Sequence, residues 1–173
     1  MAKHITLIGM MGVGKSSVAP LLAERLRRPV IEVDGLIEKH EGMPIGEIFL
    51  AKGEAYFRKV ECALIAKLLE QPPGVLSLGG GAFMWEETRE LLLAKTVVFY
   101  LSATLDVLCT RVQNGIAARP LLNTPGVSFQ DTMRDLLERR EVYYGLSHYR
   151  VETDFHSPDD VARAIVTLRE AYE

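Results

Sequence analysis

The stretch HITLIGMMGVGKSS, residues 4–17, decides the fold. A short apolar run leads directly into GMMGVGKS, residues 9–16, which matches the pattern G-x-x-x-x-G-K-[ST]. The glycines let backbone N–H groups turn inward around an anion, and a helix beginning near Lys15 adds its N-terminal dipole and unpaired donors. The pattern predicts a nucleoside triphosphate site with Mg²⁺. The residues expected to contact the nucleotide are Gly12, Val13, Gly14, Lys15, Ser16 and Ser17, with Lys15 at the outer phosphates and Ser16 as a Mg²⁺ ligand.

Two other interpretations of this loop are open. A glycine turn could merely pack a helix onto a strand. Dinucleotide binding is the second alternative, because Glu32 lies where a ribose-binding acid would fall, about 20 residues downstream. That alternative requires G-x-G-x-x-G, whereas GVGKSS places Ser17 at the third glycine and leaves Lys15 and Ser16 without a role. ATP with Mg²⁺ is therefore the favoured ligand.

The rest of the chain alternates short apolar runs with longer amphipathic stretches. The expected strands are residues 4–9, 30–34, 74–79, 96–101 and 150–153. The expected helices are residues 15–27, 54–70, 86–94, 104–112, 128–144 and 158–172. Most of these strands are apolar throughout, which is typical of strands that helices cover on both faces. The alternation predicts an α/β three-layer sandwich with a five-stranded, mainly parallel sheet, whose ligands bind at the carboxyl ends of the strands.

The bulk composition is that of an ordinary globular protein. The 173 residues suit a single domain spanning 1–173, and the formal net charge of −3 indicates neither a nucleic-acid partner nor a membrane surface. Cys62 and Cys109 have no paired or metal-ligand spacing, so two thiols in a reducing compartment are expected. No apolar run approaches the length of a membrane span, and the N-terminal run is too short for a signal peptide. We expect a cytoplasmic monomer.

Charged residues follow the second expected strand. Glu32 and Asp34, two positions apart, are expected on one face of the strand end, and Arg58 follows a glycine-punctuated helical segment. This stretch resembles the shikimate kinase family, whose pattern here is an acid-x-Asp pair, IE, a glycine, I-x-E-I-F, G-E-x-x-F-R and a glutamate. The matching pieces are Asp34, IE at 37–38, Gly42, IGEIF at 45–49, GEAYFRKVE at 53–61, LSLGGGA at 76–82, RPLL at 119–122 and RREVYY at 139–144.

The resemblance implies a P-loop NTPase of the nucleoside monophosphate kinase-like fold. It also implies transfer of the γ-phosphate of ATP to the 3-hydroxyl of shikimate, a ring acid with three hydroxyls. Arg58 and Arg140 are then expected to bind the carboxylate, which suits a guanidinium fork. Arg139 competes with Arg140, but the R-x-x-x-Y spacing to Tyr144 favours Arg140. Asp34 is expected to bind ring hydroxyls near the attacking oxygen and to orient them more than to act as a full general base.

A second glycine-rich stretch, VLSLGGGAF at residues 75–83, ends the third expected strand. It lacks a following Lys-Ser, so a second phosphate loop is not expected, and a tight strand exit is the plain interpretation. A backbone without side chains also lets a flat ring approach closely and offers N–H donors. The resemblance implies that Gly79, Gly80 and Gly81, Gly80 above all, contact shikimate.

Two flanking segments complete the expected site. The acceptor-binding segment is about residues 33–61. Residues of about 112–127 are rich in glycine and proline, which is typical of a mobile lid. The resemblance implies that this lid closes over ATP and that its Arg119 reaches the phosphates, so that Lys15, Asp34 and Arg119 form the catalytic set. Arg111 is expected to lie against the adenine.

One residue departs from the family pattern, because Glu32 stands where most members have aspartate. That position holds Mg²⁺ through its water shell, so one extra methylene can be absorbed by moving a water, and we expect a reduced but real role for Glu32 in Mg²⁺ binding. The departure leaves open a related kinase of another polyhydroxy acid such as gluconate. A non-catalytic nucleotide-binding protein of the same fold is a further alternative, although Lys15, Asp34 and Arg119 are all present.

Overall fold

The apolar run that opens the chain forms β1 (His4–Ile8), the central strand of the sheet. The structure is a computed structural model that describes residues 3–113, 126 and 128–172. The other strands are β2 (Val30–Glu32), β3 (Val75–Ser77), β4 (Thr96–Ser102) and β5 (Tyr149–Glu152). All described pairings are parallel, in the order β2-β3-β1-β4-β5. The predicted α/β class and parallel sheet are confirmed.

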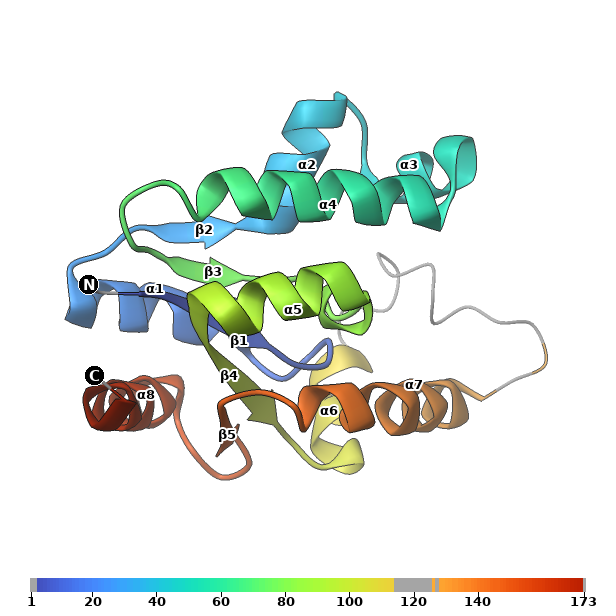
Figure 1. Cartoon of the computed structure of the whole chain (residues 1–173). Helices are drawn as coiled ribbons and strands as arrows, with labels where there is room; N and C mark the ends of the chain where they lie inside the picture. Colours follow the sequence, from blue (N-terminus) through green and yellow to red (C-terminus); the bar gives the residue numbers. More distant parts are fainter. Residues whose placement is uncertain (1–2, 114–125, 127, 173) are drawn as a thin grey trace.

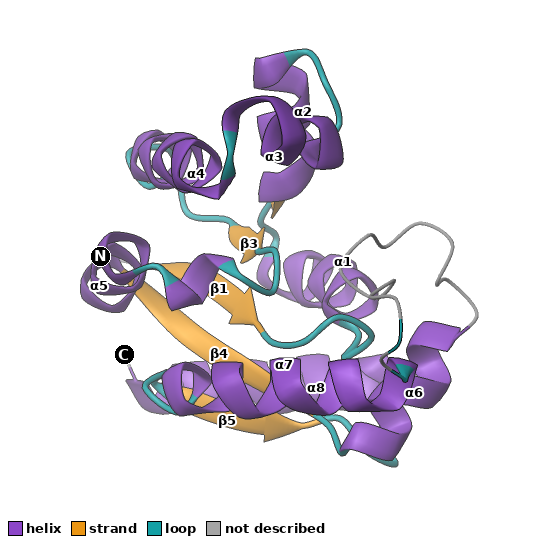
Figure 2. Cartoon of the chain, turned by 90° about the vertical axis from the view of Figure 1, so that its right-hand side faces the viewer, coloured by secondary structure: helices purple, strands orange, loops and turns teal. Residues whose placement is uncertain are grey.

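Helices cover both faces of this sheet (Figure 1). On one face α1 (Lys15–Leu26) packs against α8 (Pro158–Tyr172), and on the other α4 (Glu54–Leu68) packs against α5 (Glu86–Lys95). Figure 2 shows α1 and α5 on opposite sides of the strands. The remaining helices are α2 (Val33–Glu41), α3 (Ile45–Lys52), the 3-10 turn η1 (Ala82–Met84), α6 (Leu105–Gln113) and α7 (Phe129–Tyr144). Because both faces are covered, β1 and β4 are buried along their whole length.

The second strand is shorter than expected. Its predicted range of 30–34 is wrong at the end, because the chain turns into α2 at Val33 and places Asp34 in the first helical turn. Apolar Ile31 and Val33 alternate with Glu32 and Asp34, which imitates a strand. Val33 and Ile37, however, are both buried one turn apart, which is the periodicity of a helix. A carboxylate in the first turn also interacts favourably with the helix dipole. Helices α2 and α3 were expected only as one glycine-punctuated helical segment, without bounds.

The carboxyl ends of the three neighbouring strands β2, β3 and β1 meet at one edge of the sheet. Glu32 pairs in register with Ser77, and Ser77 with Leu7. The loop after β1, the triplet after β3 and the start of α2 are therefore side by side, as the sequence predicts for the ligand-binding end of a parallel sheet.

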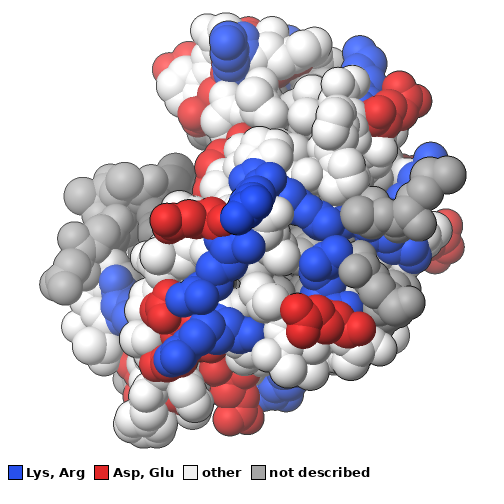
Figure 3. Space-filling model, turned by 90° about the vertical axis from the view of Figure 1, so that its left-hand side faces the viewer, with Lys and Arg blue, Asp and Glu red and all other residues white. Residues whose placement is uncertain are grey.

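The opposite end of the sheet carries a band of Lys and Arg side chains (Figure 3). Acidic side chains are mixed into the band. Basic residues also stand in the last turn of several helices, where a cation complements the helix dipole. They are Arg25 of α1, Lys67 of α4, Lys95 of α5 and Arg169 of α8. Arg25 pairs with Asp159 at 2.6 Å.

None of the helices in the described parts of the chain is both long enough and apolar enough to cross a membrane.

Candidate active site

The loop between β1 and α1 has the backbone that the sequence motif requires. Gly9 has φ 146° and Gly12 has φ 81°, both in the region that side chains rarely adopt. A Cβ on Gly9 would lie 2.5 Å from the carbonyl oxygen of Leu101, and one on Gly12 would lie 2.5 Å from Cγ2 of Val112. The loop therefore fits between β4 and α6 only with glycine at these two positions.

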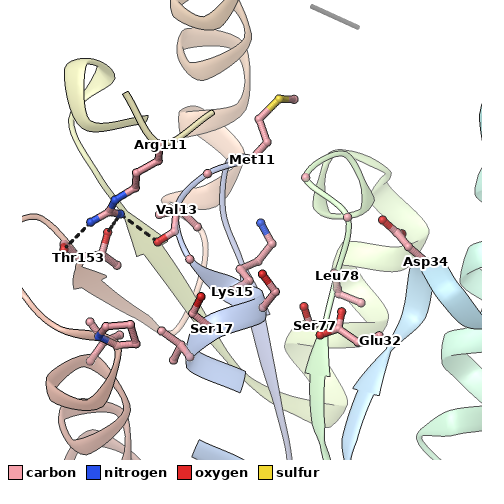
Figure 4. A pocket seen from close by; sticks show the side chains of 18 of the residues that line it. Met11, Val13, Lys15, Ser17, Glu32, Asp34, Ser77, Leu78, Arg111 and Thr153 are labelled. Carbon is pink, nitrogen blue, oxygen red and sulfur yellow. Dashed lines mark hydrogen bonds between the residues drawn. The ribbon is translucent and has the colours of Figure 1, made fainter. Parts of the chain in front are cut away.

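The first turn of α1 forms the floor of a cavity of about 730 Å³ (Figure 4). Gly14 begins this helix without a side-chain cap, which suits an anion that takes the unpaired N–H groups. The predicted nucleotide residues that line it are Gly12, Val13, Gly14, Lys15, Ser16, Ser17 and Arg111. Glu32, Asp34, Gly79 and Gly80 also line it. The structure thus brings the predicted nucleotide and metal residues into one cavity, apart from Arg119, which lies outside the described residues.

Lys15 is folded back over its own loop. Its Nζ donates to the carbonyl oxygens of Gly9, at 2.6 Å, and Met10, at 3.1 Å. These two bonds fix the position of the ammonium group in the cavity that Asp34 also lines. Burial raises the pKa of the Asp34 carboxyl, and the positive charge of Lys15 lowers it. A phosphate placed at the start of α1 would meet both the N–H groups and this cation.

Arg111 holds the other end of the cavity (Figure 4). Its Nη1 donates to the carbonyl oxygen of Val13 at 3.3 Å and to Oγ1 of Thr153 at 3.0 Å, and its Nη2 donates to the carbonyl oxygen of Thr153 at 3.2 Å. The guanidinium therefore joins α6 to the phosphate-binding loop and to the end of β5. The part of the cavity between Lys15 and Arg111 has room for a nucleotide.

A smaller cavity of about 150 Å³ adjoins the first one. The two share Met11, Asp34, Gly79 and Gly80, so a group bound in one can reach a group bound in the other. The smaller cavity is also lined by Ile45, Phe49, Phe57, Arg58, Glu61, Gly81 and Arg140. Two arginines, two carboxylates and bare glycine backbone on an otherwise apolar lining suit a small ring that carries a carboxylate and hydroxyls.

Each glycine of the triplet faces one charged side chain. A Cβ on Gly79 would lie 2.9 Å from Oδ1 of Asp34, and a Cβ on Gly80 would lie 2.6 Å from Nη1 of Arg140. A Cβ on Gly81 would overlap the Arg58 guanidinium. Asp34, Arg140 and Arg58 therefore lie around a surface that only backbone can form.

Arg58 is buried in a network of charges and rings. Its Nη1 donates to Oε2 of Glu61 at 2.7 Å, and the side chain of Glu54 lies 3.4 Å away. The guanidinium also lies 5.0 Å from the centre of the Phe57 ring, which stacks on Phe49. Glu61 is fully buried, and burial raises the pKa of its carboxyl while Arg58 lowers it. This network fixes the direction of the cation.

Asp34 lies where the two cavities meet. Burial raises the pKa of its carboxyl, the cations Lys15 and Arg58 lower it, and Glu32 and Glu38 raise it further. A half-buried carboxylate at this point can accept a hydrogen bond from a hydroxyl that faces the larger cavity. Although Asp34 lies in α2 and not in β2, it still lines the expected cavity together with Glu32.

Arg140, and not the exposed Arg139, reaches the smaller cavity. One turn further along α7, the hydroxyl of Tyr144 donates to the carbonyl oxygen of Gly80 at 2.6 Å. Arg119 lies outside the described residues, as does most of the segment expected to form the lid.

Several residues of this site were not predicted as contacts. Glu61 and Tyr144 were used only to recognise a pattern, while Met11, Glu54 and Thr153 were not singled out. The spacing of Glu54, Arg58 and Glu61 at i, i+4 and i+7 is a signal that could have paired them on one helix face. Nothing local in the sequence links Tyr144 with Gly80, 64 residues apart.

The donors around the larger cavity fit a hard divalent cation. The Ser16 hydroxyl and the Glu32 carboxylate line it, and both are the oxygen ligands that Mg²⁺ prefers. Within the described residues no group of three or more acidic, cysteine or histidine side chains could hold a metal alone.

Comparison with known proteins gives one consistent family. The family model described as shikimate kinase matches residues 11–169. A shikimate kinase of Zymomonas mobilis is 41% identical over 164 residues, covering 95% of this chain and 92% of the relative. The solved structure of the shikimate kinase from Acinetobacter baumannii in complex with shikimate superposes with a TM-score of 0.90 at 33% identity, covering 100% of this chain and 96% of that one.

A gluconokinase structure from Sinorhizobium meliloti also superposes, with a TM-score of 0.65 at 21% identity, covering 98% of this chain and 95% of that one. At that identity the likeness shows only the fold.

Proposed function

The chain belongs to the shikimate kinase family, and we propose that its two adjoining cavities are the ATP and shikimate sites of the family's reaction. Its function is transfer of the γ-phosphate of ATP to the 3-hydroxyl of shikimate, giving shikimate 3-phosphate and ADP. The observation that carries the assignment of the two sites is the triplet Gly79–Gly81. Gly79 and Gly80 line both the cavity at the start of α1 and the cavity with two arginines, and Gly81 lines the second.

On the donor side, the first turn of α1 and Lys15 bind the phosphates. The N–H groups and the ammonium compensate the negative charge of ATP, and they favour a transition state in which charge spreads over the transferred group. Arg111 lies against the adenine at the far end of the cavity, a role supported by its three hydrogen bonds to Val13 and Thr153.

On the acceptor side, Arg140 beside Gly80 and Arg58 beside Gly81 bind the carboxylate of shikimate in the smaller cavity. Gly79, Gly80 and Gly81 let the ring lie against backbone. The binding energy of the carboxylate, made far from the reacting oxygen, is available to hold the 3-hydroxyl in line with the γ-phosphate.

Asp34 binds the ring hydroxyls and orients the attacking oxygen. Its position beside both cavities and its neighbour Lys15 support this role. In a loose transition state the hydroxyl loses its proton late, so the carboxylate accepts it only as the phosphoryl group arrives. Orientation is therefore the larger contribution of Asp34.

Mg²⁺ is proposed to lie between Ser16 and Glu32. When bound it would neutralise charge on the β- and γ-phosphate oxygens. Ser16 would be a direct ligand, and Glu32, which is exposed at the end of β2, would act through water. Arg119 is proposed to reach the phosphates from the lid of about residues 112–127, with water excluded on closure.

We also propose that the protein acts as a monomer. The two cysteines, Cys62 and Cys109, are thiols, which supports a reducing compartment such as the cytoplasm. Sedimentation of the purified protein at several concentrations tests the first point.

The test of the proposed function is a coupled assay of ADP release with ATP, Mg²⁺ and a panel of shikimate, quinate and gluconate. We expect release that depends on shikimate and exceeds that with the other two acids. ADP release without an acceptor, or a preference for gluconate, would contradict the proposal. The Lys15→Ala variant, purified in the same way, should show no release and serves to exclude a contaminating ATPase.

A further inference from the structure

Helix α7 presents two side chains to the same point of the acceptor loop. Arg140 and Tyr144 are four residues apart and therefore lie on one face of the helix. A Cβ built on Gly80 would lie 2.6 Å from Nη1 of Arg140 and 3.5 Å from the hydroxyl of Tyr144. One helix thus contributes both the cation for the substrate and a group that contacts the loop beside it.

The hydrogen bond from Tyr144 completes the backbone bonding of the triplet. The carbonyl oxygen of Gly79 accepts from the N–H of Ala82 at 3.2 Å, and that of Gly81 accepts from the N–H of Met84 at 3.1 Å. The carbonyl oxygen of Gly80 instead accepts from the Tyr144 hydroxyl at 2.6 Å. Three successive glycines have no side chains to restrict their dihedral angles, so these bonds decide the loop's shape.

The ring of Tyr144 is itself held in place. It is fully buried and stacks on Tyr100 of β4, with ring centroids 4.8 Å apart and an interplanar angle of 29°. The guanidinium of Arg150 lies 5.5 Å from the centre of the Tyr100 ring, and Arg150 donates to Ser102 of the same strand at 3.1 Å. The hydroxyl is therefore delivered to Gly80 from the rigid centre of the sheet.

We propose that Tyr144 is a positioning residue for the acceptor: its hydroxyl fixes the Gly80 peptide relative to Arg140, so that both meet the substrate in one arrangement. This inference rests on the proposed function, in which Gly80 and Arg140 contact shikimate. Tyr144 itself does not line either cavity. It acts through the loop.

The test is the Tyr144→Phe variant, which removes only the hydroxyl. We expect the KM for shikimate to rise about tenfold, the factor for losing a hydrogen bond of about 1.4 kcal/mol, while the KM for ATP changes by less than about twofold. The matched control is Tyr100→Phe, which removes a hydroxyl from the same ring stack but no bond to Gly80. An equal change in both KM values for Tyr144→Phe, or an unchanged KM for shikimate, would overturn the proposal.

Two further measurements separate positioning from loss of the fold. Thermal unfolding of both variants shows whether stability alone has changed. The single tryptophan, Trp85, directly follows η1, so its fluorescence can report shikimate binding to each variant without turnover. A Tyr144→Phe variant that unfolds earlier but binds shikimate as the wild type does would contradict positioning.

The proposal can fail separately from the proposed function. If the wild type preferred gluconate in the acceptor panel, the assignment of shikimate would be wrong. The same comparison of variants with gluconate as acceptor would still decide whether Tyr144 positions Gly80.

Discussion

Arg58 and Glu61, three residues apart on α4, form an ion pair of 2.7 Å in which the carboxylate is fully buried. The second oxygen of that carboxylate, Oε1, has no hydrogen-bond partner within the described part of the chain. A charge buried in this way is costly unless it is compensated, so a buried ion pair contributes little to stability by itself. Its effect here is to hold the Arg58 guanidinium in one orientation. The acceptor site therefore depends on the carboxylate that holds this cation in place.

The first prediction concerns this pair. Glu61→Ala leaves the Arg58 guanidinium without its buried counter-ion, and the free energy of unfolding should fall by about 3 kcal/mol. The KM for shikimate should rise more than that for ATP, because the freed cation can turn away from the triplet. Urea unfolding and steady-state kinetics measure the two effects.

Glu54→Ala is the matched control for that change. Glu54 also pairs with Arg58, but at 3.4 Å and with 67% of its side chain exposed, so it should contribute less than about 1 kcal/mol. Equal destabilisation by the two variants would show that burial of the ion pair does not determine its contribution to the free energy of unfolding.

The second prediction is a conflict between stability and activity at Asp34. Burial raises the pKa of its carboxyl, so the folded protein binds this proton more readily than the unfolded chain does. The ionised form therefore opposes folding, and this opposition shrinks as the pH falls below the raised pKa and is gone below the ordinary value of 3.8. Asp34→Asn removes the charge, so Tm should rise, by about 2–4 °C per kcal/mol gained, while kcat falls by at least about 100-fold.

The control for Asp34 is Asp135→Asn on the exposed side of α7, which should leave both Tm and kcat unchanged. An Asp34→Asn variant with wild-type kcat would exclude any role of this carboxylate in orienting the acceptor. Calorimetry and initial rates at saturating substrates give the two quantities.

The third prediction concerns the triplet. Gly80 does not have a positive φ, so alanine there causes no backbone strain, and its Cβ would meet Arg140 at 2.6 Å. Gly80→Ala should therefore raise the KM for shikimate about tenfold or more, with little change for ATP. Gly81→Ala should be more severe, because the Arg58 guanidinium that it overlaps is held by Glu61 and cannot move aside.

Gly46→Ala on α3 is the control for the triplet, because a Cβ there meets nothing within 4 Å. It should leave kinetics unchanged and raise stability by about 0.5–1 kcal/mol, as expected for alanine in place of glycine in a helix. If Gly80→Ala raised both KM values equally, the contact with the acceptor would be excluded.

The fold was predictable because its signals are local. A glycine pattern between an apolar run and an amphipathic run identifies β1, the loop and α1 within 23 residues, and the same alternation locates the other strands. The error at Val33 and Asp34 has the same origin. Over three residues the periods of a strand and a helix agree too closely to separate, and burial of Val33 and Ile37 by tertiary packing decides the outcome.

The site was predictable only as a set of residues. Strand ends placed Lys15 and Asp34 together, because parallel strands end at one edge, and the resemblance to the family placed Arg58 and Arg140 with them. The hydrogen bonds and ion pairs that hold these side chains could be seen only in the structure. Tyr144 reaches Gly80 across 64 residues of chain, and no sequence period reports such a contact.

The fourth prediction concerns the acid at the end of β2. Glu32→Ala should raise the Mg²⁺ concentration needed for half-maximal velocity, while Glu32→Asp should act as well as the wild type or better, since a shorter side chain leaves the metal's water shell in place. Glu24→Ala, an exposed acid further along α1, should change nothing. A Glu32→Ala variant with the wild-type Mg²⁺ dependence would remove Glu32 from the metal site.

The fifth prediction is a pH dependence of stability that arises far from the site. The Nδ1 of His4 accepts the N–H of Gly74 at 3.1 Å, and its Nε2 lies 3.1 Å from the carbonyl oxygen of Gln71, so the ring is neutral and joins β1 to the turn before β3. Burial lowers the pKa of His4, and the charge of Arg28 lowers it further. The unfolded chain then binds a proton that the folded protein does not, so stability present above the ordinary value of 6.5 is lost as the pH falls through the lowered pKa.

The measurement is urea unfolding of the wild type and His4→Gln at several pH values between about 7.5 and 5, the range over which an ordinary histidine becomes protonated. His4→Gln should be less stable by about 1 kcal/mol at the upper end, because a backbone N–H loses its acceptor, and the difference should shrink toward the lower end. Taking the difference removes the opposite contribution of Asp34 and Glu61, whose raised pKa values favour the fold as the pH falls. His40→Gln, at a ring that is 60% exposed, should run parallel to the wild type. A constant difference between His4→Gln and the wild type would show that His4 does not titrate with folding.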